Sequence, residues 1–258
     1  MNADERRKTV LITGAASGIG AELARAFFDQ DCRLVLADIQ SPPSLADFDA
    51  RRQDVCFVQA DLSREDDCRR IVEQGIEKFA GIDILINNAG FQFVRPIESF
   101  PLAEWNRMLA VMLTAPFLLT QLVWPGMKRQ GWGRIVNIGS IHSQVASANK
   151  VGYTSAKHGL IGLTKTAALE GGPYGITANV ICPAYVRTPL VENQIAAQAE
   201  TLGIDPEAVE REVLLKSSAT GSLIEPREIA SLVCFLCTEE ARSVTGASWN
   251  IDGGWTAQ

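Results

Sequence analysis

Tyr153 and Lys157 are the two residues whose types and spacing point most directly to chemistry. They stand four positions apart in Val151-Gly-Tyr-Thr-Ser-Ala-Lys-His158, a stretch of helical period, so their side chains lie on one helix face. A phenol near a fixed ammonium has its anion stabilised, which lowers its pKa from about 10 towards a range useful for proton transfer. Ser140, just past an expected strand, can offer a hydroxyl to a carbonyl oxygen. The three together predict proton transfer at such an oxygen.

A glycine-rich turn lies near the N-terminus. The apolar run Thr9 to Thr13 predicts a strand that leads into Gly14-Ala-Ala-Ser-Gly-Ile-Gly20 and then into a helix. Glycines permit a tight turn and the close approach of a pyrophosphate, whose charge the free N–H groups and the positive helix end stabilise. A glycine cluster alone could be a simple turn, but strand, turn and helix together predict a dinucleotide site.

Asp38 ends the second expected strand, at the distance from the glycines where an acidic residue meets the adenosine ribose. Its carboxylate would accept a hydrogen bond from a 2′-hydroxyl and repel a 2′-phosphate. The turn holds Ala16 and Ser17 and no basic residue before Gly18. We therefore expect NAD rather than NADP, the alternative being a solvated carboxylate at a strand end.

The elements that must position these residues alternate along the chain. Short β-branched runs, several of them apolar at consecutive positions, predict a parallel sheet that helices cover on both faces. The expected strands are Thr9 to Thr13, Arg33 to Ala37, Val55 to Ala60, Ile84 to Asn87, Arg134 to Ile138, Thr177 to Ile181 and Ser248 to Ile251. The expected helices are Ile19 to Gln30, Arg64 to Phe79, Leu102 to Lys128, Val151 to Glu170 and Glu225 to Cys237. We predict an α/β fold, a doubly wound (Rossmann) sheet of seven strands in one domain, residues 1–258.

The region Thr188 to Ser222 breaks this alternation. Two polar helical stretches, Val191 to Leu202 and Pro206 to Lys216, stand where one crossover helix is expected. Such an insertion beyond the end of strand six predicts a lid over a ligand crevice. The alternative is a surface embellishment without function.

Composition excludes several classes of protein. Across 258 residues, 24 Lys plus Arg against 30 Asp plus Glu give a net charge of −6, which argues against nucleic acid as a partner. Apolar stretches such as Met108 to Leu119 are interrupted by Thr114 and Pro116 and fall short of the roughly 18 residues of a membrane span. The charged start, Met1 to Lys8, lacks the apolar region of a signal peptide. We expect a cytoplasmic protein without a membrane partner.

The cysteines predict neither disulfides nor a metal site. A chain of this length needs no disulfide framework, so we expect reduced core residues. Cys234 and Cys237 have the spacing of a metal-ligand pair, but no second pair exists in the sequence. We expect a buried helix face there and no metal, with a metal site as the alternative.

The whole chain resembles the short-chain dehydrogenase/reductase superfamily. The matching motifs are Thr13-Gly-Ala-Ala-Ser-Gly-Ile-Gly20, Asn87-Asn-Ala-Gly90, Ser140, Tyr153-Thr-Ser-Ala-Lys157 and Cys182-Pro-Ala-Tyr-Val-Arg-Thr188. The resemblance implies that Tyr153 donates or accepts the proton, that Ser140 polarises the reacting oxygen, and that Lys157 binds the nicotinamide ribose. It also implies a cofactor site made of Gly14, Ser17, Gly18, Ile19, Gly20, Asp38, Asp61, Leu62, Asn88, Gly90, Tyr153, Lys157, Val186 and Thr188.

Within the superfamily, the chain is similar to the bacterial D-3-hydroxybutyrate dehydrogenases. The motifs are Asn88-Ala-Gly-Phe-Gln92, Ser140-Ile-His142, Asn149-Lys150, Arg187-Thr-Pro-Leu-Val-Glu-Asn-Gln194 and Asp252-Gly-Gly-Trp-Thr256. The resemblance implies that the substrate carboxylate is bound by Gln92, His142, Lys150 and Gln194, beside Ser140 and Tyr153. One cation and three donors suit a small carboxylate. Alternatively, Lys150 is solvated and His142 satisfies a loop carbonyl.

Two positions depart from the family pattern. Met112 stands where the family has an asparagine that holds a proton-relaying water, and a thioether is at best a weak acceptor. The usual catalytic tetrad is therefore a triad here. The pair Ala184-Tyr185 replaces the common Gly-Trp, which changes the expected size of the pocket wall.

The first hypothesis is thus an NAD-dependent dehydrogenase that interconverts D-3-hydroxybutyrate, or a similar short 3-hydroxy acid, and its keto acid. A second keeps the chemistry and changes the substrate to another small hydroxy acid or a secondary alcohol. A third is a nucleotide-binding sensor without turnover, which only Met112 favours. The resemblance also implies a homotetramer with Leu102 to Lys128 and Val151 to Glu170 buried between subunits.

Overall fold

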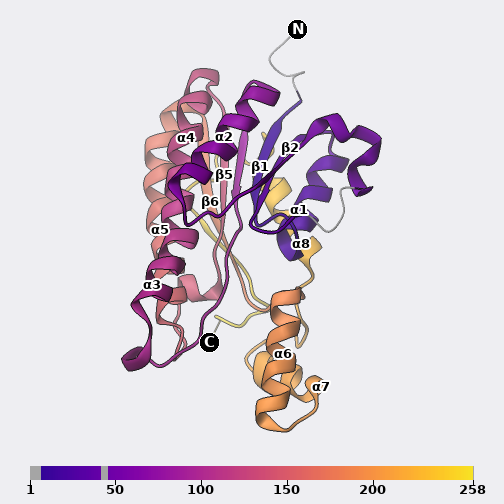
Figure 1. Ribbon diagram of the computed structural model, residues 1–258, viewed down its shortest axis with the longest axis vertical. Coiled ribbons are helices and arrows are strands. Elements are labelled where there is room, and N and C mark those ends of the chain that lie inside the picture. Colours follow the sequence, from indigo (N-terminus) through magenta and orange to yellow (C-terminus); the bar gives the residue numbers. More distant parts are fainter. Residues whose placement is uncertain (1–6, 42–45, 258) are drawn as a thin grey trace.

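Seven parallel strands form one sheet in the order β3-β2-β1-β4-β5-β6-β7 (Figure 1). The computed structural model describes residues 7–41 and 46–257, so the first six residues of the charged start lie outside it. The strands are β1 (Thr9–Thr13), β2 (Arg33–Asp38), β3 (Val55–Gln59), β4 (Ile84–Asn87), β5 (Gly133–Ile138), β6 (Ile176–Pro183) and β7 (Ser248–Ile251). The predicted Rossmann sheet is confirmed, with each strand boundary within two residues of its prediction.

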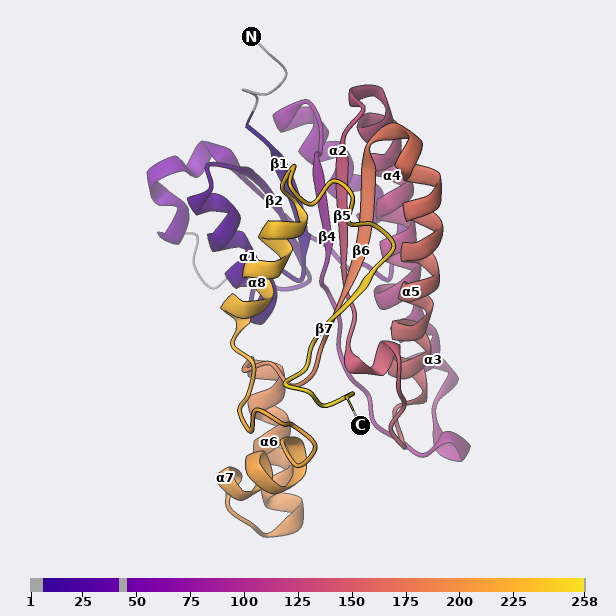
Figure 2. The ribbon, with the colours of Figure 1, turned by 180° about the vertical axis from the view of Figure 1, so that it is seen from behind.

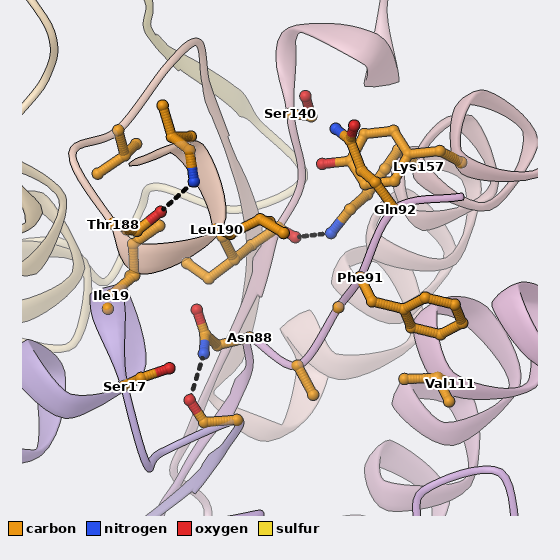
Figure 3. A pocket seen from close by; sticks show the side chains of 18 of the residues that line it. Ser17, Ile19, Asn88, Phe91, Gln92, Val111, Ser140, Lys157, Thr188 and Leu190 are labelled. Atoms are coloured by element: carbon orange, nitrogen blue, oxygen red, sulfur yellow. Dashed lines mark hydrogen bonds between the residues drawn. The ribbon is translucent and has the colours of Figure 1, made fainter. Parts of the chain in front are cut away.

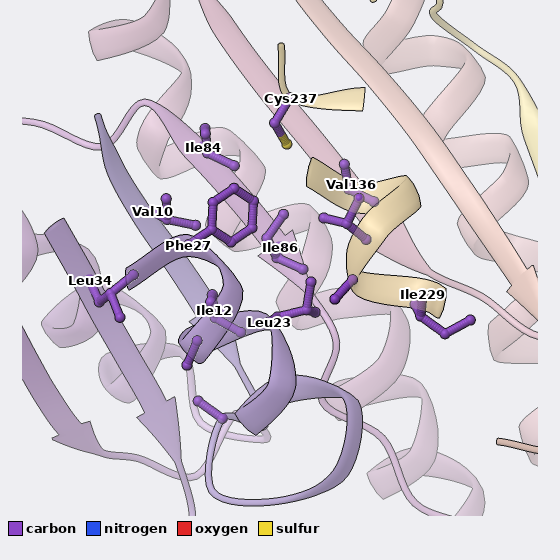
Figure 4. Packing of buried hydrophobic residues seen from close by; sticks show 14 of the residues in the cluster. Val10, Ile12, Leu23, Phe27, Leu34, Ile84, Ile86, Val136, Ile229 and Cys237 are labelled. Atoms are coloured by element: carbon purple, nitrogen blue, oxygen red, sulfur yellow. The ribbon is translucent and has the colours of Figure 1, made fainter. Parts of the chain in front are cut away.

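Helices cover both faces of the sheet (Figures 1 and 2). They are α1 (Gly18–Asp29), α2 (Glu65–Phe79), α3 (Leu102–Leu109), α4 (Ala115–Gln130), α5 (Val151–Gly171), α6 (Pro189–Leu202), α7 (Pro206–Val209) and α8 (Pro226–Leu236). Side chains alternate along each strand. In β1, Val10 and Ile12 pack under α1 and α8 (Figure 4), whereas Leu11 faces the layer of α2, α4 and α5. This two-sided burial explains why the strands are apolar at consecutive positions.

One helical run, predicted as Leu102 to Lys128, is more apolar than expected. Leu102–Gln130 joins α3, a π turn at Ala110–Thr114 and α4 into 29 residues, with a mean hydropathy of 1.6 in one 18-residue window. By length and composition this helix could cross a membrane, so the expectation that every apolar stretch falls short of a membrane span is wrong. However, 39% of that window is buried, and the run packs against α2 and α5. The core helix of a soluble protein can have the same length and composition.

The predicted lid helices are present after β6. They are α6, α7 and a π turn at Glu210–Leu214, which project beyond the strand ends (Figure 1). They have a small apolar core of their own, which Tyr185 joins from the side of the sheet. Arg187 pairs with Glu210 at 3.5 Å and with Glu225 at 3.2 Å, and so links the lid to the start of α8. A 3₁₀ segment, Ala46–Asp54, was not predicted.

The sheet brings the predicted site residues to one edge. Its order reverses between β1 and β4, because β2 and β3 lie on one side of β1 while β4 to β7 lie on the other. In doubly wound sheets ligands bind at such a switch point, beyond the carboxyl ends of the strands. The glycine turn follows β1, Asp38 ends β2, Asn88 follows β4, and Ser140 follows β5. Residues far apart in sequence therefore face one crevice.

Candidate active site

A cavity of about 420 Å³ lies at this edge of the sheet (Figure 3). Its volume is within the usual range for small-molecule sites. It gathers nearly all the predicted residues. Those in its wall are Gly14, Ser17, Gly18, Ile19, Asp38, Asp61, Leu62, Asn88, Gly90, Gln92, Ser140, His142, Lys150, Tyr153, Lys157, Val186, Thr188 and Gln194. Gln194 and Thr188 come from the lid side, which places the lid against the cavity.

Gly20 is the predicted cofactor residue that does not line the cavity. A Cβ atom there would lie 2.0 Å from the Gly14 carbonyl oxygen and 2.7 Å from Asn88 Nδ2. Gly20 therefore allows α1 to pack tightly on the turn, and its contact with the cofactor stays a prediction. Gly14, with φ of +65°, leaves room where a Cβ would meet the backbone of Ala89 at 2.9 Å.

The residues around the turn hold it in place. Asn88 Nδ2 donates to the carbonyl oxygens of Thr13, at 2.9 Å, and of Gly14, at 3.1 Å. Figure 3 shows one of these two hydrogen bonds. The Asp38 carboxylate accepts from the backbone N–H groups of Ala16 and Gln40, each at 2.9 Å. Asp38 is therefore more than a solvated strand end. Its half-buried carboxylate fixes the turn and keeps lone pairs for a ribose hydroxyl.

The predicted catalytic residues lie together. Lys157 is 4% exposed, donates to the Ile138 carbonyl oxygen at 2.6 Å, and has its Nζ 5.6 Å from the centre of the Tyr153 ring. Burial lowers the pKa of Lys157 to about 8. Burial also raises the pKa of Tyr153 and outweighs hydrogen bonds from Ser140 and Gln92 that lower it. This direction is opposite to the one expected from the lysine alone, because spacing does not reveal desolvation.

Ser140 has its oxygen oriented by the backbone. It precedes a single 3₁₀ turn, Ile141–Ser143, and its Oγ accepts from the N–H of His142 at 3.2 Å. This contact uses an acceptor lone pair and leaves the Ser140 hydroxyl proton free to be donated. Ser140 is thus a hydrogen-bond donor towards an oxygen in the cavity, next to the Tyr153 phenol.

Lys150 and His142 form a buried polar pair at the cavity wall. Their Nζ and Nε2 atoms lie 3.4 Å apart, and the residues are 9% and 3% exposed. Burial lowers the pKa of Lys150, and burial with the nearby Lys150 charge lowers the pKa of His142 to about 4. His142 is therefore neutral at pH 7, with its Nε2 accepting from Lys150 and its Nδ1 carrying the proton. Within the described ranges, His142 Nδ1 is buried without a hydrogen-bond partner.

Lys150 has no counter-ion in the described part of the chain: no carboxylate lies within ion-pair distance of its ammonium. A buried, unpaired cation is costly, and an anionic ligand would remove that cost. The pair therefore has the chemistry of an anion receptor. Gln92 and Gln194 add amide groups to the same cavity.

Met112 is buried in an apolar cluster. It is 1% exposed and forms a cluster with Met108 and Ala156, against which Tyr153 packs. Its sulfur would lie 3.3 Å from a Cβ atom placed on Gly90. Met112 belongs to the π turn Ala110–Thr114, and its side chain lies next to Gly90 in the cavity wall.

Several wall residues were not predicted from sequence. Phe91, Arg107, Val111 and Leu190 line the cavity, and the Arg107 guanidinium lies 4.9 Å from the centre of the Phe91 ring. The four-residue spacing of Arg107 and Val111 is the only available signal, because it puts both on one face of the helix. Tyr185, expected to alter the pocket wall, does line it. No cluster of metal-ligating side chains occurs among residues 7–41 and 46–257.

Comparisons with known proteins agree with this geometry. The model of the short chain dehydrogenase family matches residues 8–199. The D-beta-hydroxybutyrate dehydrogenase of Cupriavidus necator is 42% identical over 97% of this chain and 98% of its own length. The enzyme of the same name from Rhizobium meliloti is 43% identical over 97% and 99%. The ligand-free aldohexose dehydrogenase of Thermoplasma acidophilum superposes with a TM-score of 0.88 at 30% identity, covering 99% of this chain and 96% of that one.

The family match covers most of the chain, and the relatives match it from end to end. The catalytic side chains of the motif also converge on one cavity. The chain therefore belongs to the short-chain dehydrogenase family: it is an oxidoreductase, and membership implies a nicotinamide cofactor.

Proposed function

We propose that the chain interconverts D-3-hydroxybutyrate, or a similar short 3-hydroxy acid, and acetoacetate or the matching 3-keto acid, with NAD as cofactor. The relatives named D-beta-hydroxybutyrate dehydrogenase support this substrate class. The observation that carries the proposal is the buried Lys150 ammonium without a counter-ion beside His142, whose Nδ1 has no partner within the described chain. A carboxylate bound there would satisfy both groups while its hydroxyl-bearing carbon approaches Tyr153.

The residues present fit the cofactor. The glycine turn leaves space that a Cβ would fill, and Asp38 offers an acceptor at the ribose end. When bound, NAD supplies the hydride acceptor for alcohol oxidation. Tyr153 takes the hydroxyl proton, the Ser140 hydroxyl donates a hydrogen bond to the developing carbonyl oxygen, and Lys157 adds positive charge beside the phenol.

An absorbance assay for NADH tests the substrate. Both enantiomers of 3-hydroxybutyrate should be run beside other hydroxy acids and neutral secondary alcohols. We expect the highest kcat/KM with the D enantiomer. A higher kcat/KM with another hydroxy acid or an alcohol would support the second hypothesis, and binding of NAD without turnover of any substrate would support the sensor.

The cofactor preference follows from Asp38. Wild type should have a kcat/KM about 10-fold to 100-fold higher with NAD than with NADP. The Asp38 carboxylate gains a charge-assisted hydrogen bond from the 2′-hydroxyl of NAD and repels the 2′-phosphate of NADP. Asp38→Ala should narrow that ratio. Asp38 holds the N–H groups of Ala16 and Gln40 through its two oxygens, so Asp38→Asn, which removes the charge and keeps one acceptor oxygen, is the milder companion variant. Equal efficiency in wild type, or a gain for NAD in Asp38→Ala, contradicts the assignment.

Met112 is expected to limit proton delivery. The family pattern has an asparagine here, so Met112→Asn should raise kcat by about 3-fold to 30-fold, below the range of a full acid or base. The Kd for NAD should barely change, and the melting temperature should fall because the amide enters an apolar cluster. The measurements are kcat, its solvent isotope effect and the melting temperature. A lower melting temperature without a gain in kcat would make Met112 a packing residue.

We also propose a cytoplasmic homotetramer. The outer surfaces of α4 and α5 carry apolar side chains, including Phe117 at 48% and Leu169 at 81% exposure, which suits burial between subunits. The same surface accounts for the apolar character of Leu102–Gln130 without a membrane. Sedimentation of the purified protein would test the oligomeric state.

A further inference from the structure

Ser143 lies directly behind the catalytic serine and outside the cavity wall. It ends the 3₁₀ turn that Ser140 begins, and it is 1% exposed. Its Oγ accepts from the Ser140 N–H at 3.2 Å, and its own N–H donates to the Ser140 carbonyl oxygen at 2.8 Å. Both backbone polar groups of Ser140 are therefore fixed by one residue.

The Ser143 hydroxyl lies close to Gly139, which follows β5, and to residues of β6. A Cβ atom on Gly139 would stand 2.7 Å from Ser143 Oγ, 2.9 Å from Val180 Cγ2 and 3.0 Å from the Ile181 carbonyl oxygen. The Cys182 thiol borders the same turn and hydrogen bonds with Ser143, which lowers the pKa of the thiol against the effect of burial. The hydroxyl is thus packed between strands β5 and β6 and held on the Ser140 amide.

We infer that Ser143 is a positioning residue for catalysis, whose hydroxyl holds the Ser140 backbone so that Ser140 Oγ stays within hydrogen-bond reach of the Tyr153 phenol. The inference rests on the proposed roles of Ser140 and Tyr153. Ser143 itself does not line the cavity, so it acts only through Ser140. Without the Ser143 oxygen, the buried Ser140 N–H loses its acceptor, and Ser140 is held only by the contacts of its carbonyl oxygen and its Oγ.

The first test is Ser143→Ala, assayed with whichever panel substrate the wild type oxidises best. We expect kcat to fall about 10-fold, while KM and the Kd for NAD change less than about 2-fold. The rising limb of the kcat/KM profile for oxidation should move to higher pH by about half to one pH unit, because Ser140 stabilises the phenolate less well. Ser143→Cys keeps a side chain of similar volume with a weaker acceptor, so its kcat and its pH profile should lie between those of wild type and Ser143→Ala. This variant also tests the inference if Ser143→Ala folds poorly.

Thr245→Ala is the matched control, since Thr245 Oγ1 accepts from the backbone N–H of Ala178 at 3.1 Å on the far part of β6. It should lower the melting temperature and leave the pH profile unchanged. NMR titration of ¹³C-labelled tyrosine measures the pKa of Tyr153 directly. The chain has three tyrosines, and Tyr153→Phe assigns the signal. The titration needs no substrate, so it separates this inference from the proposed function. Wild-type kcat and an unmoved profile in Ser143→Ala would overturn the inference.

Discussion

Replacing Tyr153 with phenylalanine should remove most turnover, about 10²-fold to 10⁴-fold in kcat, and leave NAD binding nearly intact. The ring would still pack against the apolar cluster that contains Met112, and only the oxygen that hydrogen bonds with Ser140 and Gln92 is lost. Steady-state kinetics and NAD titration of the same variant measure both effects. A Tyr153→Phe enzyme with near-normal kcat would remove Tyr153 from the mechanism.

The pH dependence of wild type follows from the same residue. Oxidation needs the deprotonated phenol and reduction the protonated one, and burial raises the pKa of Tyr153. Alcohol oxidation should therefore speed up as pH rises, while keto-acid reduction slows. Lys157→Ala is the variant to compare with Tyr153→Phe. It should weaken both turnover and NAD binding, whereas Tyr153→Phe should weaken turnover alone.

The architecture was predictable because its signals are local. Runs such as Thr9 to Thr13 are apolar at consecutive positions since both faces of β1 are buried. The 3₁₀ segment Ala46–Asp54 was missed because it has no apolar period, with charged residues in most positions. The helix Leu102–Gln130 was predicted to within two residues, but its apolar stretch was underestimated because Pro116 was taken as an interruption. Pro116 stands in the first turn of α4 and continues the helix after the π turn.

The sequence predicted which residues line the site, but not how they pack or how their pKa values shift. Residues at the carboxyl ends of neighbouring strands meet at one edge, so Gly14, Asp38 and Ser140 share a cavity. Three features depend on three-dimensional packing and escape sequence reasoning. They are the Gly20 contact with the turn, the desolvation that raises the pKa of Tyr153, and the backbone clamp from Ser143 to Ser140.

Removing the Lys150 side chain should lower kcat/KM for hydroxy acids and leave kcat/KM for neutral alcohols nearly unchanged. Lys150→Ala should lower kcat/KM for the hydroxy acid by about one to two decades, since a charge-assisted hydrogen bond contributes roughly 1.5–3 kcal/mol and about 1.4 kcal/mol is one decade. A neutral analogue such as 2-butanol, already a poor substrate, should barely change.

The matched control for that variant is Lys165→Ala, which removes an exposed lysine from α5 and should leave both rates intact. Burial lowers the pKa of Lys150 from its usual 10.5, so its ammonium loses its proton at a lower pH than that of an exposed lysine. Wild type should therefore lose affinity for the acid as pH rises through that lowered pKa. The loss should be absent in Lys150→Ala, where no ammonium remains to titrate. If Lys150→Ala discriminates between acid and alcohol as well as wild type does, the carboxylate binds elsewhere in the cavity, and the unpaired ammonium beside His142 serves another purpose.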